Sequence, residues 1–99
     1  MIAGKTCPVR RADIWLRRVA GESALVDPDT GAVHLMNDTA LAIWDLCDGN
    51  TVPDEMITAI CDLCGMHRDV VAEDVHRILT DFAVAGVITW APDEEDARA

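Results

Sequence analysis

The stretch that decides the fold is HLMNDTALAIWDLCDGN, residues 34–50, in which a short apolar segment runs directly into an amphipathic helix. Asn37 or Asp38 can cap this helix, because a short polar side chain accepts a hydrogen bond from the free backbone N–H groups of the first turn. Gly49 is the expected end of the helix. Its apolar side chains recur at helical spacing, at Ala40, Ile43, Trp44 and Cys47. A strand followed at once by a capped helix predicts a sheet packed on helices.

Three candidate strands precede this helix, and we expect them to form an antiparallel meander. They are residues 13–19 (DIWLRRV), 23–27 (SALVD) and 32–36 (AVHLM). Between the last two lies DPDTG, residues 27–31, whose turn-forming residues predict a hairpin loop. Residues 32–36 show little polar alternation, whereas a strand with one wet face should alternate. We therefore expect both faces of this strand to be covered, one by the core and the other by the third helix or by a partner bound in a groove.

A second helix is expected after Gly49. Residues 51–54, TVPD, have the form of a capping box led by Thr51, with Pro53 in the first turn. Gly65 should end this helix. Its predicted buried face consists of Ile57, Ile60, Cys61 and Cys64.

The third and longest helix can be capped by Asp69 and should end at Gly86. Its predicted apolar face consists of Val71, Val75, Ile78, Leu79 and Phe82. Residues 87–90 (VITW) then form a short closing strand or an extended tail. The order of elements predicts an α+β fold of winged helix-turn-helix type, a three-stranded antiparallel sheet packed on three helices.

One domain is expected, because no linker or internal repeat interrupts the chain. We assign residues 13–90 to the domain, residues 1–12 to a flexible N-terminal arm and residues 91–99 to a solvated acidic tail. The 99-residue chain has no apolar run near the ~20 residues of a membrane span, and its first residues lack the apolar core of a secretion signal. A cytoplasmic protein without a membrane partner is expected.

The charge of the chain is strongly asymmetric. Residues 1–18 carry a net charge of +4, and the remaining residues carry −14. An acidic body repels a phosphate backbone and lacks the basic footprint of a nucleic-acid binder. The charge favours a protein or peptide partner, or serves solubility alone. Asp69, Glu73 and Asp74 crowd the start of the third helix, where they either favour the helix dipole or form an acidic rim for a basic partner group.

The residue pattern that best fits a metal site is CDLCGMH, in which Cys61, Cys64 and His67 follow C-x2-C-x2-H spacing. Cys47 could supply a fourth zinc ligand, and the C-x-x-C pair could be redox-active. The cysteines also fall on apolar helix faces, where cysteine packs as a small hydrophobe. We favour the core interpretation and expect neither a metal nor another cofactor. No Ser/His/Asp arrangement and no phosphate loop is present, which argues against an enzyme.

Two longer segments carry a family resemblance, ALVDPDTGAVHLMNDTALAIWDLCDGNTVPDEMITAI and VAEDVHRILTDFAVAGVI. They resemble the pyrroloquinoline-quinone biosynthesis protein D family, which belongs to the wider group of precursor-peptide recognition elements of ribosomal peptide natural products. Arg10-Arg11 before the first strand also fits, whereas Met36 stands where the family has leucine. The matching positions are Asp27, Pro28, Gly31, Met36, Asn37, Ala40, Ile43, Trp44, Asp48, Gly49, Thr51, Asp74, Val75, Gly86 and Ile88.

The resemblance implies a non-catalytic adaptor that binds the leader segment of a precursor peptide and presents it to a modifying enzyme, such as a radical enzyme, a protease or a cyclase. It implies that the leader adds as a strand beside residues 32–36, with side chains in a groove against the third helix. The implied peptide-binding residues are Ala32, Val33, His34, Leu35, Met36, Val71, Asp74, Val75 and Ile78. The resemblance does not specify which precursor or enzyme is involved. The rival interpretations are a winged-helix transcription regulator and a small Cys/His metal-binding protein.

Overall fold

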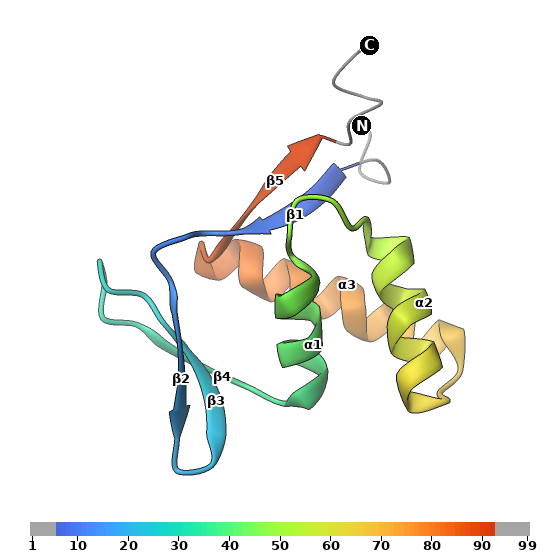
Figure 1. Ribbon diagram of the computed structural model, residues 1–99, viewed down its shortest axis with the longest axis horizontal. Helices are drawn as coiled ribbons and strands as arrows, with labels where there is room; N and C mark the ends of the chain where they lie inside the picture. Colours follow the sequence, from blue (N-terminus) through green and yellow to red (C-terminus); the bar gives the residue numbers. More distant parts are fainter. Residues whose placement is uncertain (1–5, 93–99) are drawn as a thin grey trace.

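The computed structural model describes residues 6–92, and within them the predicted α+β class is confirmed (Figure 1). Strands β2, β3 and β4 form an antiparallel sheet in that spatial order, with β3 in the centre. Helix α1 lies between this sheet and α2 in Figure 1. The elements are β1 (Thr6–Arg10), β2 (Trp15–Val19), β3 (Glu22–Val26), β4 (Val33–Met36), α1 (Asp38–Leu46), α2 (Pro53–Cys64), α3 (Arg68–Ala85) and β5 (Ile88–Pro92).

A second, two-stranded sheet joins the two ends of the described chain. Strand β1 pairs with β5 in antiparallel register, with Pro8 opposite Trp90. A flexible arm was expected for residues 1–12, and for residues 6–10 the structure shows a strand instead. The pairing buries Cys7 and Pro8, and the Arg10 guanidinium donates to the Trp44 carbonyl at 3.0 Å. Residues 1–5 and 93–99, which include most of the expected tail, lie outside the described residues.

Helix α1 begins as the sequence predicted. Asn37 is its N-cap, and the Asn37 side chain accepts a hydrogen bond from the Ala40 N–H at 2.8 Å. Asp38 is the first helical residue. The helix ends at Leu46, before the expected Gly49, because the Cys47 N–H already turns back to the Trp44 carbonyl.

The start of α2 corrects the predicted capping box. The Thr51 hydroxyl donates to the carboxylate of Asp48 and does not cap the helix. The N-cap is Val52, whose N–H donates to the side chain of Glu55 at 3.1 Å. A capping box has two reciprocal hydrogen bonds, and only this one is present, because the valine side chain has no acceptor. Gly65 ends the helix in the left-handed conformation, with φ of 65°.

Helix α3 starts at Arg68, with His67 as an N-cap that makes no side-chain hydrogen bond. Asp69, the predicted cap, lies in the first turn instead. All five residues of the predicted apolar face of α3 are buried. The hydrophobic core also contains Trp44, whose ring meets Phe82 edge-on at 5.6 Å between ring centroids.

The buried face of α2 differs from the prediction at two positions. Ile57 and Ile60 are buried as expected, but Cys64 is exposed and Cys61 is only half-buried. Met56, which the helical spacing had not selected, is fully buried. The last turn of α2 extends past the core, so its apolar side chains have little to pack against.

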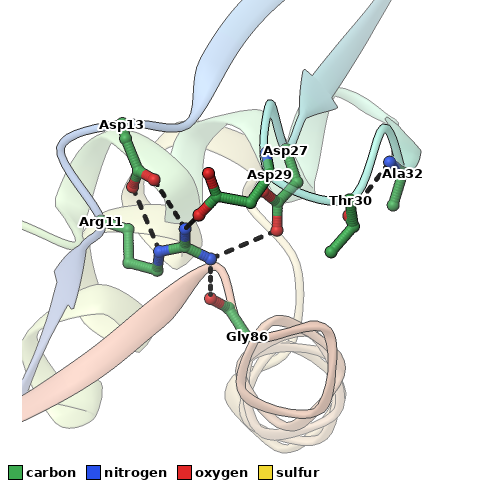
Figure 2. A network of polar contacts seen from close by, with 7 residues as sticks. All are labelled: Arg11, Asp13, Asp27, Asp29, Thr30, Ala32 and Gly86. Atoms are coloured by element: carbon green, nitrogen blue, oxygen red, sulfur yellow. Dashed lines mark hydrogen bonds and ion pairs between the residues drawn. The ribbon is translucent and has the colours of Figure 1, made fainter.

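A polar network around Arg11 ties the two sheets to the end of α3 (Figure 2). The guanidinium donates to both carboxylate oxygens of Asp13, to Asp27 and to Asp29, and to the Gly86 carbonyl at 2.9 Å. These partners belong to the β1–β2 connection, to the turn after β3 and to the C-terminus of α3. The network therefore fixes the DPDTG turn, and with it the entry of β4.

Candidate functional site

Strand β4 has one unoccupied edge among the described residues, because its only partner strand there is β3. The Asp27 N–H donates to the Ala32 carbonyl at 2.9 Å, which marks this pair as hydrogen-bonded in the antiparallel ladder. Bonding alternates along such a pair of strands, so His34 is the next residue that bonds to β3. The N–H and C=O groups of Val33 and Leu35 consequently point toward the free edge.

The side chains of β4 alternate between two environments. Met36 is buried and His34 is half-buried on the face that packs against the helices. Val33 and Leu35 lie on the opposite face, where their side chains are 56% and 62% exposed. An exposed edge strand that carries large apolar side chains invites pairing with another chain. These features make β4 a candidate site for an added strand.

A cleft of about 160 Å³ lies between β4, the start of α1 and the C-terminal half of α3. We call it the β4–α3 cleft, and its deepest residues are the buried Met36, Ala40, Ile78 and Phe82. Its polar rim is formed by Asn37, Arg77 and Asp81 from the two helices. Arg77 also donates to Asp74 at 3.1 Å, one turn earlier on α3. The cleft thus combines an apolar floor with one positive and one negative side chain.

The residues implied by the resemblance do not all reach this cleft. His34, Leu35 and Met36 line it together with Ile78, whereas Ala32 and Val33 do not. Val71 and Val75 do not line it, and both are buried in the core. Asp74 pairs with Arg77 on the surface of α3 instead.

Sequence reasoning missed the lining residues Asn37, Ala40, Arg77, Asp81 and Phe82. The signal that could have found the three on α3 is helical spacing, because residues 77, 78, 81 and 82 share one side of a helix. The sequence did not say at which turn α3 passes β4. The crossing occurs about one turn later than the resemblance implied.

The cysteine and histidine pattern does not converge in the structure. Cys47 is buried at the C-cap of α1, where its Sγ donates to the Ile43 carbonyl at 3.2 Å and burial raises the pKa of its thiol to about 12. Cys64 is exposed at the end of α2. Within residues 6–92, no group of three His, Cys, Asp or Glu side chains is arranged to hold a metal ion.

Two further features bear on the rival interpretations. The exposed side chains of α3 include Glu73 and Asp81 beside Arg77, so the helix carries no basic stripe of the kind that contacts a phosphate backbone. In the part of the chain that the structure describes, no helix is long and apolar enough to cross a membrane.

Comparisons with known proteins agree with this fold. The family described as coenzyme PQQ synthesis protein D (PqqD) matches residues 22–88. A solved structure titled "TbiB1 in Complex with the TbiA(beta) Leader Peptide" is 21% identical, with a TM-score of 0.69 over 81% of this chain and 93% of that one. "Lasso peptide synthetase B1 complexed with the leader peptide" is 22% identical, with a TM-score of 0.69 over 83% and 96%. Among curated protein sequences, none matches this chain.

Proposed function

Because this chain belongs to the PqqD family, we propose that it is a peptide-binding adaptor that binds the leader segment of a ribosomally made precursor peptide and presents it to a modifying enzyme. The observation that carries the proposal is the free edge of β4, with the outward N–H and C=O groups of Val33 and Leu35 beside the β4–α3 cleft. Both similar structures share this fold, and their titles name a bound leader peptide.

The leader binds as an additional strand next to β4. Its backbone bonds to Val33 and Leu35 provide affinity that does not depend on sequence, and the side-chain pockets provide specificity. Side chains of a strand alternate, so one set of leader side chains faces the helices and the other lies beside Val33 and Leu35 on the exposed face. The adaptor itself performs no chemistry in this scheme.

Specificity arises mainly in the β4–α3 cleft. Its volume of about 160 Å³ suits one anchoring side chain of the leader, seated on Ile78 and Phe82. Arg77 and Asp81 on the rim then favour leaders with charges complementary to theirs at the neighbouring positions.

A pair of proline variants tests strand addition. Val33→Pro removes an outward N–H and should leave the β3–β4 ladder intact, whereas His34→Pro breaks a bond to β3 and should harm folding. A lost hydrogen bond of about 0.5–1.5 kcal/mol, together with obstruction by the ring, should weaken leader binding about tenfold or more in Val33→Pro. Calorimetric titration with the leader segment of the cognate precursor peptide measures the affinity, and a thermal melt reports folding.

Leu16→Pro is the matched control, because alternation along β2 places the Leu16 N–H on the opposite outer edge of the same sheet. It introduces the same ring into an edge strand without touching β4, so leader affinity should stay at the parent value. If Val33→Pro remains folded and binds the leader as tightly as the parent, strand addition at β4 is wrong.

A further inference from the structure

A second cavity lies away from β4. It has a volume of about 530 Å³ and opens between the first turn of α2, the middle of α3 and the β1–β5 ribbon. We call it the Leu79 cavity, because the buried Leu79 side chain forms its floor. Thr6, Pro53 and the 44% exposed Trp90 line it too. Asp54, His76 and Thr80 are its exposed polar lining residues.

The Leu79 cavity and the β4–α3 cleft share no residue, although α3 lines both. Residues 76, 79 and 80 face the cavity, and residues 77, 78, 81 and 82 face the cleft. At about 100° per residue, the two sets lie on roughly opposite sides of the helix. Both sites can therefore be occupied at the same time. The cavity volume falls within the range of about 300–1,000 Å³ that is usual for ligand pockets.

The surroundings of the cavity are acidic. Asp54 lines it, and Glu55 follows in the first turn of α2. Asp54, Glu55 and Asp62 also line a neighbouring surface depression on α2, where Arg68 is the one basic lining residue. An apolar cavity beside these carboxylates is complementary to a segment that carries positive charge around an apolar side chain.

We propose that the Leu79 cavity is the docking site for a basic segment of the modifying enzyme, which inserts an aromatic or aliphatic side chain between Leu79, Pro53 and Trp90. The identity of the partner rests on the proposed function. The location follows from the structure, because an enzyme that acts on the bound leader must dock without covering β4. Docking on one side of α3 leaves the leader accessible on the other.

Three synthetic hexapeptides, acetylated and amidated, probe this site on the full chain. KKFLKK carries charge and an apolar anchor, KKSSKK lacks the anchor, and EEFLEE reverses the charge. The backbone amide resonances are followed by NMR during titration. KKFLKK should shift the signals of Asp54, Leu79 and Trp90, with a dissociation constant of about 1 mM. KKSSKK and EEFLEE should bind at least about fivefold more weakly there.

A filled-cavity variant tests the location. Thr80→Trp places an indole at the mouth of the cavity and should weaken KKFLKK binding about fivefold or more. Val84→Trp is its matched control, because Val84 is 84% exposed on the same helix and does not line the cavity. Asp54→Asn should weaken binding about twofold at low salt, whereas Asp62→Asn should change it less.

Two outcomes would overturn the proposal. One is the absence of shifts at the cavity with KKFLKK at about 5 mM, and the other is EEFLEE binding there as tightly as KKFLKK. These results are independent of strand addition, because Val33→Pro should still bind KKFLKK and Thr80→Trp should still bind the leader. Loss of leader binding in Thr80→Trp, with the fold intact, would also contradict the separation of the two sites.

Discussion

The Arg11 guanidinium lies 3.2 Å from the carboxylate of Asp27, which joins the connection between β1 and β2 to the turn that leads into β4. Asp27 is buried, and its other carboxylate oxygen accepts a hydrogen bond from the Asp29 N–H at 2.9 Å. Figure 2 shows the Asp27 carboxylate and the Gly86 carbonyl meeting the same guanidinium nitrogen. One carboxylate thus controls the geometry of the strand that we propose as the binding edge.

The buried Asp27 should make the fold sensitive to acid. The Asp29 N–H lowers the pKa of Asp27 first, and the charge of Arg11 lowers it further. A carboxyl whose pKa is lower in the folded chain stabilises the fold above the unfolded value of about 3.9 and loses that contribution as the pH falls through the folded value. We expect unfolding free energies from denaturant titrations to fall more steeply below about pH 5 for the parent than for Asp27→Asn. Parallel pH profiles would contradict this role.

The cap of α1 should be worth a measurable part of the stability. The Asn37 side chain satisfies the Ala40 N–H at 2.8 Å, so Asn37→Ala should cost about 0.5–2 kcal/mol. Asp38→Ala, which removes a first-turn charge without removing the cap, should cost less. Urea unfolding measures both. An equal loss in the two variants would show that charge at the helix start, and not the cap, is what matters.

The cysteines should differ sharply in their reaction with a disulfide reagent. Cys64 is exposed and should react quickly in the folded protein. Cys47 is buried with a thiol pKa of about 12, so at pH 8 only about one molecule in ten thousand carries the reactive thiolate. Spectrophotometric thiol titration should therefore show a fast phase that Cys64→Ser removes. Cys47 should react only as fast as the chain opens. Fast labelling of Cys47 would contradict its position in the core.

Substitution of an α3 core residue outside the cleft should lower stability alone, whereas substitution of a buried residue that lines the cleft should lower both stability and leader affinity. Val75→Ala should destabilise the fold by about 2 kcal/mol, because Val75 is fully buried and does not line the cleft. Its leader affinity, measured by calorimetry well below the melting temperature, should equal that of the parent. Ile78→Ala should lose both stability and affinity. A loss of affinity in folded Val75→Ala would place this residue in the binding site after all.

The sequence predicted most of the fold, because its strongest signals act over a few residues. The Asn37 cap, the glycines that end α2 and α3, and the helical spacing of the α3 core need no distant partner to be recognised. The predicted cap at Thr51 was wrong, because its hydroxyl can bond either to the start of the helix or to a nearby carboxylate. In the structure it donates to Asp48. The helical spacing also assigned the exposed Cys64 to the buried face of α2, because spacing alone does not show where the core ends.

The candidate site could be predicted only in part. The sequence and its family resemblance selected β4, whose lack of polar alternation is visible in five residues. Which of its N–H groups face outward depends on the register with β3, which the Asp27–Ala32 bond sets. Which residues of α3 face β4 depends on the packing of that helix. The resemblance placed Val71, Val75 and Ile78 there, and of these only Ile78 lines the cleft, together with Arg77 and Asp81.

The sequence by itself determined the elements from β2 to α3, their order and most of the apolar faces, because capping, turn formation and side-chain periodicity are local properties of the chain. Only the tertiary structure decided that residues 6–10 are a strand, because their partner β5 lies near the other end of the chain. It alone decided that α3 separates a cleft at β4 from the Leu79 cavity, which the β1–β5 ribbon helps to enclose. The physical reason is that both features arise from contacts between segments distant in sequence, whose approach is fixed by how the whole core packs.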